Sequence, residues 1–174
     1  MLDPIRFVIP GPPQRKERPR FAKKTGRAYT PAATRKAENR IAELCKSAME
    51  KIGMTNPFTG PVRVNIEAVF EAPKSWPKYL RERTVRGTVW HCTNGDPDLD
   101  NITKLCDGLN GTAFADDCQV AVLTAGKRFG SPARVEVQII PLSQDEAEIT
   151  PGQRRLEADM ASGEWHLKRA ARGF

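Results

Sequence analysis

Apolar and polar residues alternate along four short segments of the chain, the pattern of β-strands with one buried face. The clearest segment is residues 61–70, where Val62, Val64 and Ile66 share one face and polar side chains occupy the other. The other three segments are residues 5–9, 118–129 and 133–142. The pattern therefore predicts a small β-sheet.

One longer segment has helical periodicity, with apolar side chains every three to four residues. The stripe consists of Ala37, Ile41, Leu44, Ala48 and Ile52. Thr30 is predicted to cap this helix, Pro31 to lie in its first turn and Gly53 to end it. Residues 72–97 are irregular apart from a helical turn near residues 75–83. Together these elements predict a mixed α/β fold, a single small domain whose sheet packs against helices.

The C-terminal residues have a different character from the rest of the chain. Residues 143–174 are polar, lack a clear apolar stripe and contain Pro151, Gly152 and Gly163. We therefore predict a folded domain over residues 1–142 and a polar C-terminal tail over residues 143–174. No apolar run approaches the roughly 20 residues that span a bilayer, and the N-terminus has no signal-peptide pattern. The expected location is the cytoplasm, with no membrane partner.

Positive charge is concentrated in one part of the chain. Between Arg15 and Arg40 lie ten Lys or Arg residues and two acids, whereas the whole chain carries a net charge of +7. A local basic surface of this kind is typical of binding to a polyanion, although a merely solvated surface is the alternative. The Lys-Lys-Thr-Gly run within it predicts a β-hairpin that brings Phe21 and Tyr29 near each other. The two rings are interpreted either as stacking partners for unpaired bases or as simple packing partners.

An acidic segment from Gly95 to Gly111 carries four aspartates in this otherwise basic protein. The pattern predicts a loop followed by a helix, with Asp98 or Asp100 as its N-cap. Lys104 lies one helical turn after Asp100 and can approach it. The residues expected to face the core are Ile102, Leu105, Cys106 and Leu109.

A second acidic pair, Asp116 and Asp117, immediately precedes a predicted strand. A helix that returns toward the sheet would bring this pair beside Asp98 and Asp100, forming an all-oxygen site suited to Mg²⁺ or Mn²⁺. Lys104 could then neutralise charge that develops on a phosphoryl oxygen or leaving group. Local roles as helix caps and turn residues are the alternative explanation for these acids. With four scattered cysteines, no CxxC pair and only two histidines, a zinc site is not expected and the cysteines are predicted to be reduced.

A calcium loop is a second interpretation of the acidic segment. Asp96, Asp98 and Asp100 occupy positions 1, 3 and 5 of an EF-hand-like pattern, and Asp107 falls at position 12. Position 6 is Asn101 rather than the required glycine, and no apolar helix precedes the loop. The calcium interpretation is therefore the weaker of the two.

The run "PDLDNITKLCDGLNG", followed by "DDCQV" and by Lys127, is similar to the RusA family of Holliday junction resolvases. Members of that family are small endonucleases common in phages and prophages. The N-terminal "RPRF" and "GRAYTP" runs that precede the long helix resemble the same family. The resemblance extends over about residues 4–142.

The resemblance implies a homodimeric α/β enzyme that makes paired nicks in four-way DNA junctions with the help of Mg²⁺. On the matching positions, Asp98, Asp100 and Asp117 would be catalytic, metal-binding carboxylates and Lys104 the essential lysine. Asp116, Asn101 and Asp107 would support the site. Contacts to DNA are predicted for Arg15, Lys16, Arg18, Arg20, Phe21, Lys23, Lys24, Arg27, Tyr29 and Lys127. No small-molecule cofactor is expected.

Two other functions remain open at the level of the sequence. The chain could be a non-catalytic DNA-binding protein in which a metal only stabilises the acidic loop. It could also be a nuclease with the same chemistry that prefers flaps or replication forks to four-way junctions.

Overall fold

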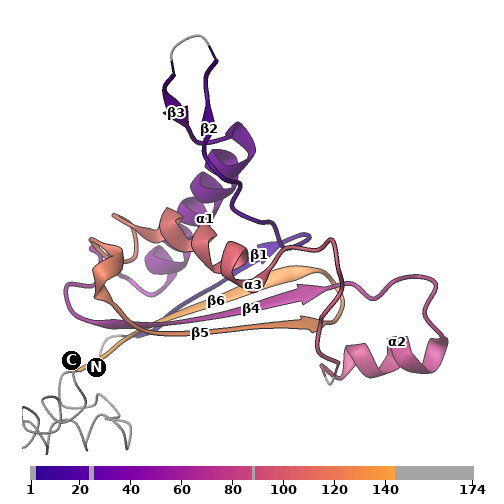
Figure 1. Ribbon diagram of the computed structural model, residues 1–174. Helices are drawn as coiled ribbons and strands as arrows, with labels where there is room; N and C mark the ends of the chain where they lie inside the picture. Colours follow the sequence, from indigo (N-terminus) through magenta and orange to yellow (C-terminus); the bar gives the residue numbers. More distant parts are fainter. Residues whose placement is uncertain (1–2, 24–25, 88, 144–174) are drawn as a thin grey trace, which may run out of the picture. The chain divides into compact units, whose positions relative to one another are not determined.

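In the computed structural model, the described residues are 3–23, 26–87 and 89–143. Four strands form one mixed sheet in the order β1-β6-β4-β5 (Figure 1). The strands are β1 (Ile5–Pro10), β4 (Val62–Phe70), β5 (Val120–Phe129) and β6 (Arg134–Pro141). β4 pairs with β5 in parallel, whereas the β1–β6 and β4–β6 pairs are antiparallel. The predicted mixed α/β fold with a small sheet is confirmed.

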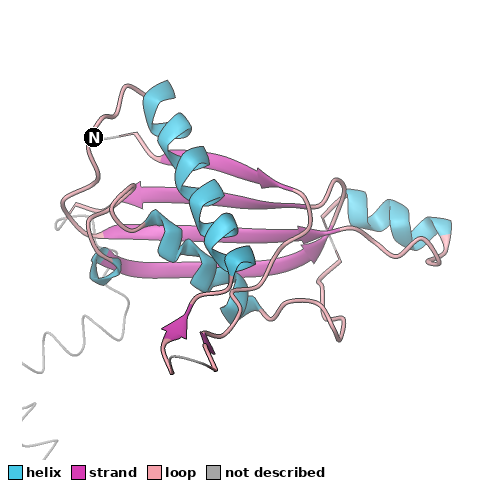
Figure 2. Cartoon of the chain, turned by 90° about the horizontal axis from the view of Figure 1, so that it is seen from above, coloured by secondary structure: helices cyan, strands magenta, loops and turns pink. Residues whose placement is uncertain are grey.

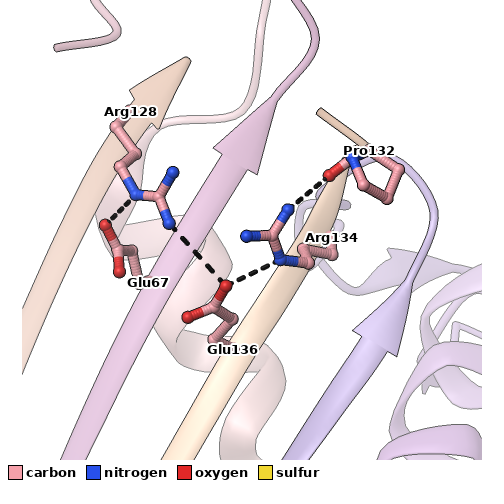
Figure 3. Close-up of polar contacts among 5 residues, drawn as sticks. All are labelled: Glu67, Arg128, Pro132, Arg134 and Glu136. Carbon is pink, nitrogen blue, oxygen red and sulfur yellow. Dashed lines mark hydrogen bonds and ion pairs between the residues drawn. The ribbon is translucent and has the colours of Figure 1, made fainter. Parts of the chain in front are cut away.

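The two faces of the sheet differ as the alternation of residues requires. Val62, Val64 and Ile66 are nearly inaccessible to solvent and join the core. The opposite face carries polar and charged side chains, among them an ion-pair network drawn in Figure 3. There Arg128 pairs with Glu67 and lies 3.7 Å from Glu136, which in turn accepts a 2.6 Å hydrogen bond from Arg134.

The long helix α1 (Ala32–Lys51) covers the apolar face of the sheet (Figure 2). Its buried residues include Ile41, Cys45 and Ala48, which pack in the same core as the strands. Two details of the predicted helix are wrong. The N-cap is Pro31, with an extended ψ of 146°, rather than Thr30. Ile52 does not continue the buried stripe, because it lies after the last helical residue and is 38% exposed.

Gly53 ends α1 as predicted. Its φ of 69° is a left-handed conformation that favours glycine. The amide nitrogen of Met54 donates to the Met49 carbonyl oxygen at 2.9 Å and that of Gly53 to Glu50 at 3.0 Å, which is the Schellman arrangement. The predicted stop signal is therefore confirmed by its hydrogen bonds.

The basic segment forms the predicted β-hairpin, which projects away from the sheet beyond the N-terminal end of α1 (Figure 1). Its strands are β2 (Arg20–Phe21) and β3 (Ala28–Tyr29), with Arg20 opposite Tyr29 and Phe21 opposite Ala28. Because neighbouring positions of a strand point to opposite faces, the rings of Phe21 and Tyr29 lie on different faces of the hairpin. The expectation that they lie near each other is wrong. The rings are 72% and 48% exposed, respectively.

The connection from β4 to β5 contains the other helices of the described residues. α2 (Lys78–Val85) lies beyond the end of the sheet and confirms the predicted helical turn (Figure 1). α3 (Leu99–Thr103) and the 3₁₀ helix η1 (Lys104–Leu109) lie beside α1 on the same face of the sheet (Figure 2). A second 3₁₀ turn, η2 (Asp117–Gln119), leads directly into β5.

The cysteines are unpaired, as expected for reduced thiols. All four are free thiols, and Cys45 is buried whereas Cys92 and Cys118 are exposed. Burial raises the pKa of the Cys45 thiol to about 12. None of the helices in residues 3–23, 26–87 and 89–143 is long and apolar enough to cross a membrane. Apart from Ser143, the predicted C-terminal tail lies outside the described residues, so the domain boundary stays a prediction.

The contact between η1 and α1 depends on a glycine. A Cβ atom built on Gly108 would lie 2.6 Å from the carbonyl oxygen of Glu38, and that oxygen belongs to a helix backbone that cannot move freely. We predict that Gly108→Ala lowers the free energy of unfolding by about 1–3 kcal/mol, the usual cost of overpacking. Urea denaturation of both proteins measures this difference as a shift of the midpoint.

Gly60→Ala is the matched control for that substitution. A Cβ at Gly60 meets no atom within 4 Å, and its φ is not positive. Its effect should stay within about 0.5 kcal/mol. Equal stability of the Gly108→Ala protein and the wild type would contradict the close packing of η1 on α1.

Candidate functional site

The acidic segment folds as a loop that runs into a helix, as predicted, but the helix changes type. Asp98 is the N-cap of α3, which gives way to the 3₁₀ helix η1 at Lys104. Ile102 and Leu109 are buried in the core, and Cys106 is partly buried against it. The side chain of Leu105 lies outside the described part of the chain. One side of the segment therefore packs, and the other presents its polar groups to solvent.

The two aspartates at the start of α3 are both exposed. Asp98 has the backbone conformation of an N-cap, yet its carboxylate makes no capping hydrogen bond to the helix. The Asp100 carboxylate accepts a 2.9 Å hydrogen bond from Lys104 one turn later. This hydrogen bond lowers the pKa of Asp100 below its ordinary value. The predicted Asp100–Lys104 approach is confirmed.

In the second acidic pair, one aspartate has a structural role and the other is open to solvent. The Asp116 carboxylate accepts a 2.9 Å hydrogen bond from the Cys118 backbone, and Gln119 closes the reciprocal half of a capping box. The hydrogen bonds from Cys118 lower the pKa of Asp116. Asp117 is exposed in the 3₁₀ turn that precedes β5. The alternative interpretation as a cap thus describes Asp116 well, and Asp117 remains available for chemistry.

A small hollow of about 210 Å³ gathers part of the predicted site. Its lining includes Lys104, Asp107 and Asp117, together with apolar residues such as Val64 and Leu123. The structure thus brings Lys104 of η1 and Asp117 of η2 to one hollow beside the start of β5. Asp98 and Asp100 do not line it.

The side chains do not form a complete metal site as they stand. Carboxylate oxygens without thiolate or imidazole are the donors that Mg²⁺ prefers, so the donor set fits in kind. Within the described ranges, however, no three His, Cys, Asp or Glu side chains lie close enough together to hold a metal ion. Two of the carboxylates have other partners, since Asp100 accepts from Lys104 and Asp116 from the backbone of Cys118.

Asp107 and Lys16 join the acidic segment to the N-terminal basic segment. The Lys16 ammonium pairs with Asp107 and lies 3.0 Å from Glu38 of α1, while its backbone nitrogen donates to the Asn101 carbonyl oxygen at 2.9 Å. Burial disfavours the charged form of Lys16, but the two carboxylates outweigh it and raise the pKa. The sequence predicts that Lys16 contacts DNA. In the structure Lys16 binds Asp107, Glu38 and the backbone of Asn101, contacts that the sequence did not indicate.

The calcium-loop interpretation is disfavoured by these partners. Asp96 lies 2.8 Å from the imidazole of His91, and Asp107 is paired with Lys16. Asp100 is paired with Lys104 in the same way, so three of the four aspartates that matched an EF-hand face side chains of the protein rather than a common centre.

The predicted DNA-contacting residues of the N-terminal segment lie mostly on the surface. Arg18, Arg20, Lys23 and Arg27 are exposed on or beside the hairpin, and Arg20 pairs with Glu17 at 2.8 Å. Lys24 lies outside the described residues. Arg15 and Lys127 instead donate hydrogen bonds to backbone oxygens of the acidic loop, Arg15 to Gly95 at 3.4 Å and Lys127 to Pro97 at 3.2 Å. No single-position signal in the sequence distinguishes these two cations from the others.

The chain is similar to known proteins over most of its length. Residues 10–140 match the family described as "Endodeoxyribonuclease RusA". The fold and the acidic segment thus belong to an endodeoxyribonuclease, an enzyme class that cuts phosphodiester bonds within DNA. The chain belongs to the RusA family. It is also similar to the uncharacterized protein YqaN of Bacillus subtilis (strain 168), with 29% identity over 147 residues that cover 82% of this chain and 99% of that protein.

The Asp100–Lys104 hydrogen bond has a measurable electrostatic consequence. Because Lys104 stabilises the charged carboxylate, Asp100 should remain ionised to a lower pH than an ordinary aspartate. We predict that Lys104→Met raises the pKa of Asp100 toward its ordinary value. A pH titration of the Asp100 carboxyl carbon by NMR measures the shift.

Lys78→Met provides the control, because Lys78 forms an exposed pair with Glu82 at the same i,i+4 spacing. That substitution should leave the Asp100 titration unchanged. Identical Asp100 titrations in the wild type and the Lys104→Met protein would show that the pair does not persist in solution.

Proposed function

We propose that the protein is a Mg²⁺-dependent endonuclease that resolves four-way DNA junctions by paired symmetric nicks. The observation that carries the proposal is the arrangement of Lys104 and Asp117 at one hollow, with exposed Asp98 and Asp100 on the adjoining helix, in a chain of the RusA family. Exposed carboxylates beside a lysine suit a reaction at a phosphodiester, whose transition state gathers negative charge.

The metal would be held by Asp98, Asp100 and Asp117, with Mn²⁺ as a possible substitute for Mg²⁺. A bound divalent ion of this kind supplies an activated water and neutralises charge on the scissile phosphate. The Asp98 carboxylate makes no capping hydrogen bond, and Asp100 is paired with an exposed lysine. Both side chains can therefore reorient without breaking the core. Lys104, released from Asp100, would face the phosphate or the leaving oxygen.

The basic segment would hold the DNA next to this site. Lys16 contacts both Asp107 and the backbone of Asn101, so the basic segment begins beside the acidic one. Exposed arginines and lysines on the hairpin would bind phosphates through a salt-sensitive electrostatic attraction. A substrate that lies across the hairpin is thereby brought toward Asp98 and Asp100.

The symmetry of the substrate favours a homodimer. A four-way junction is approximately two-fold symmetric, and its resolution takes two matched cuts. An isologous dimer with one site in each subunit supplies them. The proposed assembly on branched DNA is therefore a pair of identical chains.

A non-catalytic DNA-binding protein is the second candidate. It is favoured by one observation, that no three potential ligands within the described residues are gathered around one point. Binding of branched DNA without cleavage would identify this function. Cleavage of flaps or replication forks in preference to four-way junctions would instead identify a related nuclease.

The decisive experiment incubates the protein with a labelled four-way junction and Mg²⁺. We expect symmetric nicks in opposite strands near the crossover. Asp100→Asn should lower the cleavage rate roughly 100- to 1000-fold, as loss of a charge-stabilising group usually does, while binding persists because the side chain keeps its shape.

Asp3→Asn is the matched control for the loss of one exposed carboxylate, since Asp3 is exposed and precedes β1. That protein should cut at the wild-type rate. Normal cutting by the Asp100→Asn protein would show that the site is elsewhere, and binding of the junction by the wild type without cutting would reject the resolvase proposal.

The exposed rings of the hairpin predict a separate contribution to binding. Base stacking on an aromatic side chain is worth about 1–3 kcal/mol, so Phe21→Ala should weaken junction binding by roughly 5- to 150-fold. Fluorescence anisotropy with a labelled junction and no divalent metal measures the change. Because Phe21 and Tyr29 lie on different faces of the hairpin, Tyr29→Ala tests which face meets the DNA.

Val85→Ala is the control for the loss of an exposed apolar side chain. Val85 is 75% exposed at the end of α2, away from the hairpin. Its removal should leave the affinity unchanged. If neither ring substitution changes the affinity, the hairpin rings do not stack on DNA.

A further inference from the structure

The loop that precedes Asp98 rests on a buried histidine. His91 is only 5% exposed, and its ring stacks on Phe70 with the ring centres 4.0 Å apart. The ring centre of Phe129 lies 4.6 Å from that of His91, with the two ring planes tilted. These phenylalanines are the last residues of the parallel strands β4 and β5. The imidazole is therefore packed against the ends of two core strands.

The imidazole directs a single polar contact toward the loop. Its Nε2 atom lies 2.8 Å from a carboxylate oxygen of Asp96, and its Nδ1 atom is buried without a hydrogen-bond partner. Because a carboxylate only accepts hydrogen bonds, Nε2 donates to Asp96. A buried polar ring with one satisfied atom is costly, so the Asp96 contact is the interaction that makes the burial of His91 tolerable.

Two cations hold the residues on either side of Asp96. The Lys127 ammonium, which projects from β5 on the core side of the sheet, donates to the Pro97 carbonyl oxygen at 3.2 Å. The Arg15 guanidinium donates to the Gly95 carbonyl oxygen at 3.4 Å. The three residues before Asp98 are thus each held by a different side chain, and Pro97 further restricts the backbone.

These contacts take the place of the missing helix cap. The carboxylate of the N-cap residue Asp98 makes no capping hydrogen bond, although its backbone carbonyl oxygen accepts from the amides of Asn101 and Ile102 at 3.1 Å. The backbone immediately before Asp98 is held by the contacts of His91 with Asp96 and of Lys127 with Pro97. Because the Asp98 carboxylate is not used for capping and its backbone is held in place, this carboxylate is suited to bind a ligand outside the helix.

We propose that His91 and Lys127 are positioning residues, which hold the loop of residues 95–97 so that Asp98 and Asp100 face the DNA. The inference rests on the proposed nuclease function and deepens it. It gives Asp96 a structural role as the contact point of His91. It also removes Lys127 from the set of direct DNA contacts, because its ammonium group is directed at the loop backbone.

The test compares Asp96→Ala with the wild type in two measurements on the full chain. In hydrogen exchange without metal, Asp96→Ala should speed exchange of the amides of residues 95–102 only. In single-turnover cleavage of a four-way junction, the rate should fall roughly 10- to 100-fold, as when an outer partner of a site is removed. The dissociation constant for the junction should not change. Asp96→Asn, which keeps a hydrogen-bond acceptor for His91, should restore most of the rate.

Asn94→Ala is the matched control, because Asn94 is an exposed residue of the same loop. It should change neither measurement. Lys127→Met should reproduce the loss of rate at unchanged affinity, and Lys127→Arg should recover part of the rate.

Each contrary result overturns the proposal. Unchanged exchange in Asp96→Ala shows that the loop is not held by His91, and faster exchange throughout the chain shows a general structural role. Weaker junction binding by Lys127→Met, with a normal rate at saturation, makes Lys127 a DNA contact. If the wild type cuts no junction, the proposed function fails, whereas the exchange measurement still decides whether His91 holds the loop.

Discussion

The parallel pairing of β4 with β5 is the constraint on which the rest of the structure depends. Parallel neighbours cannot be joined by a tight turn, so the chain must travel back along the sheet before β5 begins. That return connection contains α2, the acidic segment and η2. The acidic segment therefore lies within this connection, and β5 begins directly after the 3₁₀ turn η2, which contains Asp117. The site is a consequence of the crossover.

Cations of the protein itself stabilise the acidic segment inside a basic chain. Lys16 forms an ion pair with Asp107, Lys104 forms one with Asp100, and Lys127 donates a hydrogen bond to the loop backbone. These contacts lower the repulsion among carboxylates that lie close in sequence. Lys104 thereby engages one of the three carboxylates proposed to bind the metal.

The short helices α3 and η1 each have a buried side and an exposed side with different roles. Ile102 and Leu109 anchor α3 and η1 to the core, and Gly108 lets η1 approach the backbone of α1 closely. The opposite side is left free for charged groups. The same division holds at the N-terminal end of α1, since α1 packs in the core whereas Phe21 and Tyr29 of the adjoining hairpin are exposed.

The sequence alone determined the strands, the long helix with its Gly53 stop, the basic hairpin and the membership of the acidic residues in one segment. Local periodicity and turn chemistry carry this information, because it depends on residues close together in the chain. Only the tertiary structure decided that Phe21 and Tyr29 face apart, that Lys16 and Lys127 bind the acidic segment, and that His91 supports Asp96. Those facts depend on strand register and on contacts between residues far apart in sequence, which no local pattern encodes.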